Sequence, residues 1–113
     1  MTPSHITTHV LDTSTGKPAA GIPVRLEAGN QGAWSEVAAA TTDTDGRVKD
    51  LGPEVLESGT YRLQFTTAEY FANSNTATFF PEVVLVFTVD RDEPHYHVPL
   101  LLSPFSFSSY RGS

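Results

Sequence analysis

The chain has 113 residues, 39% of them hydrophobic and 18% charged, which is enough for one modest core and too little for two. Seven basic against thirteen acidic residues give a formal net charge of −6, which disfavours nucleic acid and anionic membranes as partners, since both need a concentrated positive surface. The lack of cysteine excludes disulfides, thiol nucleophiles and cysteine-based metal sites. We therefore expect a single domain over residues 1–113.

Alternation of apolar and polar residues dominates the chain and predicts short β-strands. In chain order, expected strands cover residues 6–10, 22–28, 34–41, 61–65 and 82–89, and the last third of the chain contains further strand-like segments. In the first of them His9 lies on the face opposite Ile6 and Val10. Residues 34–41 contain three consecutive alanines, which have low strand propensity. The run 82–89 is apolar on both faces, which predicts a central strand that is covered on both sides.

One segment departs from this alternation. Ala68, Phe71 and Ala72 lie at helical spacing, and Thr66 or Thr67 before them is suited to cap a helix of two turns at most. Elsewhere, turn-forming residues separate the strands at short intervals. Strands of this length with one short helix predict an all-β fold, an antiparallel β-sandwich of seven to eight strands.

The histidines are the first candidates for chemistry. His95 and His97 are two residues apart in an expected strand, so both side chains should leave the same face. Such a pair could bind zinc with His9 as a third ligand, although the spacing alone is a weak signal. His5 lies near the N-terminus, where we expect a frayed segment and an ordinary polar side chain.

Arg47 directly follows a tight turn formed by Asp43, Thr44, Asp45 and Gly46. The two aspartates suggest a calcium loop, but the glycine is misplaced for one and the closing glutamate is absent, so we interpret them as turn formers. Taken alone, Arg47 fits a solvated charge at the end of a strand.

The C-terminal segment keeps a strand-like pattern almost to its end. Phe105 and Phe107 alternate with small hydroxyl residues, and the chain finishes in Tyr-Arg-Gly-Ser. An aromatic ring, a guanidinium and the terminal carboxylate are thus placed side by side. Because chain ends are usually polar and weakly structured, this pattern predicts a docked terminus.

Three stretches together resemble the 5-hydroxyisourate hydrolase family, the transthyretin-related proteins. They are residues 6–12 (Ile-Thr-Thr-His-Val-Leu-Asp) with Gly-Lys-Pro-Ala at 16–19, the Thr-Asp-Gly-Arg turn at 44–47, and residues 95–105 (His-Tyr-His-Val-Pro-Leu-Leu-Leu-Ser-Pro-Phe) with the terminal Tyr-Arg-Gly-Ser. The resemblance covers essentially the whole chain. A small departure is Ser106-Phe107, where the family often has Gly-Tyr, and it touches no catalytic position.

This resemblance implies a transthyretin-like (prealbumin-like) β-sandwich and an enzyme of urate degradation. The implied reaction is hydrolysis of the N1–C6 amide of 5-hydroxyisourate to 2-oxo-4-hydroxy-4-carboxy-5-ureidoimidazoline, without a cofactor or a metal. The family's catalytic residues fall on His9, Arg47 and His97. The expected substrate-binding residues are His9, Arg47, Tyr110, Arg111, Gly112 and Ser113.

The same resemblance implies a homotetramer, built as a dimer of dimers. In the expected mechanism His97 is the preferred base, His9 orients the water or protonates the leaving nitrogen, and Arg47 holds the substrate. An acid limb with an apparent pKa of about 6–7 follows from a histidine base.

Two alternatives remain open at this point. The first is a transthyretin-like binding protein that carries a small aromatic ligand without turnover, although transthyretin lacks the histidine–arginine set and the Tyr-Arg-Gly-Ser ending. The second is a zinc hydrolase that uses His9, His95 and His97. The first residues show no secretory signal, so we expect a cytoplasmic setting, with a processed periplasmic form or a peroxisomal setting as alternatives.

Overall fold

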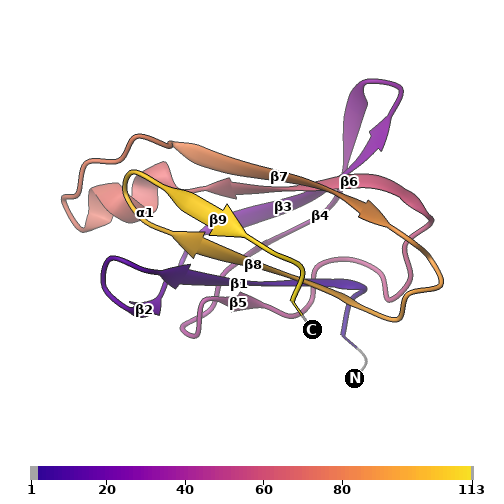
Figure 1. The fold of residues 1–113 in the computed structure, drawn as a ribbon, viewed down its shortest axis with the longest axis horizontal. Helices are drawn as coiled ribbons and strands as arrows, with labels where there is room; N and C mark the ends of the chain where they lie inside the picture. The colour runs from indigo at the N-terminus through magenta and orange to yellow at the C-terminus, as the bar shows by residue number, and fades with distance from the viewer. Residues whose placement is uncertain (1–2, 113) are drawn as a thin grey trace.

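The computed structural model describes residues 3–112, and in them nine strands and one helix form two packed layers (Figure 1). The strands are β1 (Ile6–Asp12), β2 (Lys17–Pro18), β3 (Pro23–Asn30), β4 (Ala33–Thr41), β5 (Arg47–Val48), β6 (Gly59–Thr66), β7 (Glu82–Val89), β8 (Tyr96–Leu102) and β9 (Phe107–Ser109), and the helix is α1 (Ala68–Asn73). The predicted sandwich and its short helix are confirmed. Strand β5 directly follows the predicted turn at residues 43–46, and β2 was not predicted as a strand.

One layer is a five-stranded sheet in the order β2-β1-β8-β9, with β5 also paired to β1, and the other has the order β4-β3-β6-β7. The prediction of a wholly antiparallel sandwich is wrong in one place, because β1 and β8 run parallel. Hairpins impose antiparallel pairing on strands that follow each other closely, whereas β1 and β8 come from opposite ends of the chain and are free of that constraint.

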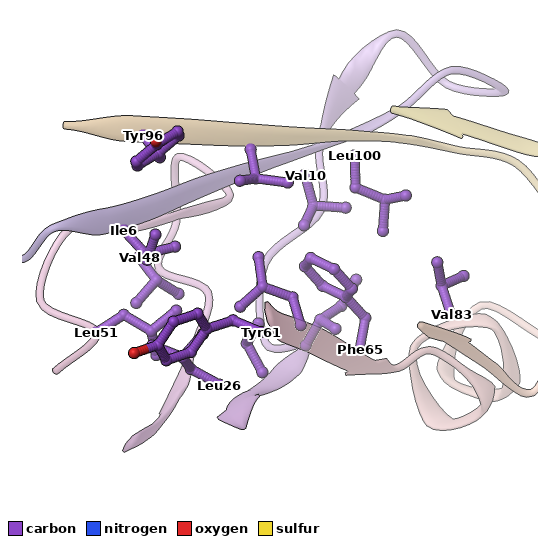
Figure 2. Packing of buried hydrophobic residues seen from close by; sticks show 14 of the residues in the cluster. Ile6, Val10, Leu26, Val48, Leu51, Tyr61, Phe65, Val83, Tyr96 and Leu100 are labelled. Carbon is purple, nitrogen blue, oxygen red and sulfur yellow. The ribbon is translucent and has the colours of Figure 1, made fainter. Parts of the chain in front are cut away.

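The hydrophobic core lies between the two sheets (Figure 2). Ile6, Val10 and Leu100 reach it from the first sheet and Leu26 and Phe65 from the second, and all five side chains are fully buried. Burying an aliphatic or aromatic side chain of this size contributes about 1.5–3 kcal/mol to folding. Because these side chains fill the space between the sheets, polar residues of the same strands point to the outer faces.

The prediction that residues 82–89 form a central strand is wrong, because β7 is the last strand of its sheet. Val83 and Val89 are buried, whereas Val84 and Val86 are 38% and 59% exposed. The strand therefore has one core face and one open face. Its outer face carries Val84 and Val86 between Glu82 and Thr88, so the middle of the strand is apolar on both faces and hides the alternation in the sequence.

Two local expectations also change. Thr67 precedes α1, but its hydroxyl donates to the carbonyl oxygen of Phe80 at 2.8 Å and makes no capping bond. His5 is fully buried instead of frayed: its Nδ1 accepts from the Leu56 amide at 2.8 Å, and its Nε2 donates to the Glu93 carbonyl at 2.7 Å.

No helix within residues 3–112 is long and apolar enough to span a membrane.

Gly46 should be far less tolerant of substitution than Gly16, although both have φ near +74°. A left-handed backbone costs alanine about 1–2 kcal/mol at either position. At Gly46 the added Cβ would also collide with the Val10 carbonyl oxygen, whereas nothing lies within 4 Å of a Cβ at Gly16. We expect Gly46→Ala to destabilise the fold by about 1–3 kcal/mol more than Gly16→Ala, measured by urea unfolding. Equal losses would contradict this packing of the turn on β1.

Candidate active site

His9 and Arg47 are direct neighbours across two strands. Thr8 and Val10 of β1 are fully buried, so His9 between them projects from the other face of the sheet. The antiparallel pairing of β1 with β5 sets His9 directly opposite Arg47. Residues opposed in this way have their Cβ atoms about 4.5–5.5 Å apart on one face. Both side chains are half-buried, which leaves them partly open to a ligand.

A hydrogen-bonded turn fixes the position of Arg47. Asp43 Oδ1 accepts from the backbone amides of Asp45 and Arg47, both at 2.9 Å, and the bond from the Arg47 amide is the main reason that the pKa of Asp43 is lowered. The Gly46 carbonyl in turn accepts from the Val10 amide at 2.7 Å. The turn is therefore attached to β1, and the interpretation of Asp43 as a turn former is confirmed.

His97 joins this face from the other side of β1. The parallel pairing of β1 with β8 sets Thr7 opposite His97, and Thr7 and His9 share the outer face of β1. The Oγ1 atom of Thr7 lies 2.9 Å from His97 Nδ1 and also 2.9 Å from His95 Nε2. His95 and His97 thus leave the same face, as predicted. Thr7 was not among the predicted site residues, although its alternation with His9 is visible in the sequence.

The surroundings of His97 favour its neutral form. Burial is the largest cause of its lowered pKa, followed by the positive charge of Arg47 and by the neighbouring His9 and His95. A neutral imidazole at neutral pH has a free lone pair and can accept a proton. The arrangement therefore supplies a base next to a permanent cation.

The C-terminal segment packs directly on His97. The Gly112 amide donates to the His97 carbonyl at 2.7 Å, and the two residues form an antiparallel bridge. A Cβ at Gly112 would lie only 2.8 Å from Cδ2 of the His97 ring, so the approach requires glycine. The predicted docking of the terminus is confirmed as far as Gly112, and Ser113 lies outside the described residues.

Arg111 and Tyr110 do not join the histidines. The Arg111 guanidinium lies 4.4 Å above the ring of Tyr96 and 3.5 Å from a carboxylate oxygen of Glu93. Tyr96 belongs to the core face of β8, opposite the face of His97. Tyr110 is 60% exposed, and with Arg111 it lines a groove along residues 84–88 of β7.

The structure thus gathers His9, Arg47, His97 and the backbone of Gly112 on one outer face of the β5–β1–β8 sheet, with Thr7 and His95 beside them. Across residues 3–112, no three histidine, aspartate or glutamate side chains are grouped so that they could hold a metal ion. Chemically, the face offers a neutral base, a second imidazole and a guanidinium, which suits addition of water to a carbonyl that becomes an oxyanion.

Known proteins similar to this chain include enzymes named as hydrolases. A 5-hydroxyisourate hydrolase from Salmonella dublin is 45% identical over 109 residues, covering 96% of this chain and 80% of that protein. The structure of Klebsiella pneumoniae 5-hydroxyisourate hydrolase has a TM-score of 0.85 and 33% identity, covering 97% of this chain and 100% of the other. A transthyretin from Sparus aurata has a TM-score of 0.90 and 29% identity, with 96% of each chain covered.

The backbone alone does not distinguish 5-hydroxyisourate hydrolases from transthyretins, because the transthyretin superposes on this chain at least as well as the hydrolase does. Residues 6–112, which include His9, Arg47 and His97, match one family along their whole length. The chain belongs to the HIUase/transthyretin family, where HIUase stands for 5-hydroxyisourate hydrolase.

Proposed function

We infer that this chain is an enzyme that hydrolyses 5-hydroxyisourate in urate degradation. The observation that carries this function is the convergence of His9, Arg47 and His97 on one partly open face, in a chain 45% identical to a protein named for that activity. A binding surface needs no imidazole with a lowered pKa beside a guanidinium, whereas these two groups can supply the base and the oxyanion donor that amide hydrolysis uses.

In the proposed reaction His97 acts as the general base. Its Nε2 takes a proton from a water molecule while the water oxygen bonds to C6 of the substrate, and the carbonyl electrons move onto the oxygen. The tetrahedral intermediate then collapses, the N1–C6 bond breaks, and N1 receives a proton from an imidazolium. His9 is placed to orient the water or to protonate N1. The lowered pKa of His97 supports its role as base.

Arg47 acts as an electrophilic clamp in this scheme. A guanidinium presents several N–H donors in one plane, which matches a planar urate-like anion and the oxyanion that forms during attack. The turn anchored by Asp43 and Gly46 holds the start of β5 before substrate arrives. Such preorganised donors need little rearrangement in the transition state, which is the source of their catalytic effect.

We further propose that the working unit is a homotetramer, a dimer of dimers, with each site completed at a subunit interface. In one chain the reactive side chains stand on the outer face of a sheet, while the core side chains fill the space between the sheets. A second copy packed over that face would enclose the substrate and exclude bulk water. Isologous contacts around two-fold axes are the common way to cover such a face.

His9→Asn, Arg47→Lys and His97→Asn should each lower kcat/KM by orders of magnitude and leave the fold intact. Removal of one oxyanion donor typically costs about 10²–10³ in kcat, and an ammonium cannot reproduce the planar fork of Arg47. The loss of absorbance of freshly generated 5-hydroxyisourate gives the rate, and circular dichroism checks the fold. Near-normal hydrolysis by any one variant would remove that residue from the proposed site.

On the acid side, kcat/KM should decline with an apparent pKa below 6.5. The reason is that the pKa of His97 is lowered, so its neutral form persists to more acidic pH. Since the Arg47 charge contributes to this shift, Arg47→Gln should raise the pKa of His97 in an NMR titration. The titration is needed because the rate profile alone reports coupled groups together. A profile that is flat from pH 5 to 8, or an unchanged His97 titration, would argue against this assignment.

Deletion of residues 110–113 should abolish activity while the fold and the tetramer largely remain. The deletion removes the Gly112 amide that bonds to His97, and Gly112→Ala should have a similar effect through its contact with the His97 ring. Light scattering and circular dichroism accompany the assay. A fully active truncation, or a fully active monomer at assay concentration, would contradict a site completed by the terminus and an interface.

A further inference from the structure

The hydroxyl of Thr7 sits between two imidazole rings on the site face. Thr7 is 8% exposed, and its Oγ1 lies 2.9 Å from both His95 Nε2 and His97 Nδ1. A threonine hydroxyl carries one proton and two lone pairs. These two ring nitrogens are its hydrogen-bond partners in the described structure, and its single proton can point to only one of them, so at least one ring must donate to Oγ1.

We propose that Thr7 is a positioning residue that fixes the tautomer of His97, with His97 Nδ1–H donating to Thr7 Oγ1 and the Thr7 hydroxyl donating to His95 Nε2. This inference rests on the proposed hydrolase function, and within it Thr7 acts through His97 without touching the substrate. His95 serves as the final acceptor of the chain of hydrogen bonds.

If the hydrogen bonds between the three residues ran in the opposite direction, His97 could not act as a base. If Thr7 donated to His97 Nδ1, neutral His97 would carry its proton on Nε2, which would then have no lone pair for water. In the proposed direction Nε2 is free, and after it takes a proton Nδ1–H keeps the same acceptor. No hydroxyl then has to rotate during the reaction, which is the advantage of a base oriented by a fixed partner.

The surroundings on the other elements are compatible with this direction. The groups that face His97 are Thr7 and His9 of β1, Arg47 of β5 and His95 just before β8. Burial, and after it the charge of Arg47, lowers the pKa of His97 and disfavours its doubly protonated form, so the neutral ring carries its proton on one nitrogen or the other. His95 is half-buried just before β8, and its Nε2 must carry no proton if it accepts from Thr7.

The test compares Thr7→Val, which keeps the shape and removes the hydroxyl, with Thr7→Ser, which keeps the hydroxyl. Thr8→Val is the matched control, since Thr8 is also buried on the same strand but donates to the Val98 carbonyl on the core side. We expect Thr7→Val to lower kcat by about 10–100-fold with little change in KM, the size of loss seen when a hydrogen-bond partner that orients a metal-bound imidazole is removed. Thr7→Ser should recover most of the rate, and Thr8→Val should lose stability but not kcat.

The second readout is independent of activity. Nitrogen-15 NMR of the imidazoles should show His97 protonated on Nδ1 in the wild type and in Thr8→Val, and a shift toward the Nε2–H form in Thr7→Val. A wild-type His97 with its proton on Nε2, or a Thr7→Val variant with unchanged kcat and tautomer, would overturn the proposal. If the wild type did not hydrolyse 5-hydroxyisourate, the proposed function would fail, and the tautomer measurement would still decide the role of Thr7.

Discussion

Seven consecutive residue pairs join β1 to β8 in parallel, from Ile6 opposite Tyr96 to Asp12 opposite Leu102, and the site depends on this register. It sets Thr7 beside His97, while the pairing of β1 with β5 sets His9 beside Arg47. A slip of one residue would turn the outward side chains of one strand into the core and expose the residues that now fill it. The burial of Ile6, Val10 and Leu100 therefore fixes the chemistry of the opposite face.

The same packing accounts for the reactivity expected of these groups. Arg47 begins a two-residue strand that would be too short to hold a side chain without the Asp43 turn and its bond to β1. The pKa of His97 is lowered by burial first and by the nearby guanidinium second. The backbone of Gly112 closes on it from the C-terminal side. The proposed base His97, the proposed clamp Arg47 and the C-terminal segment thus come from parts of the sequence far apart, and backbone pairing holds each of them in place.

Much of this arrangement could be predicted from the sequence, and the failures have physical causes. Alternation gave the strands around Val24 and Leu63, and the motif resemblance identified His9, Arg47 and His97. Periodicity carries no information on strand direction or on which strand lies at an edge, so the parallel β1–β8 pair and the exposed Val86 were missed. The bonds of Thr7 to two histidines depend on that same pairing and could not be seen from spacing along one strand.

In the proposed mechanism, imidazole and guanidinium groups open the substrate ring without a metal ion. The most direct measurement generates 5-hydroxyisourate with urate oxidase and follows its ultraviolet absorbance with protein that has been exhaustively treated with a strong chelator and checked by elemental analysis. The treated protein should accelerate the decay as fast as untreated protein does. Loss of activity on chelation, with recovery when zinc is added, would contradict it.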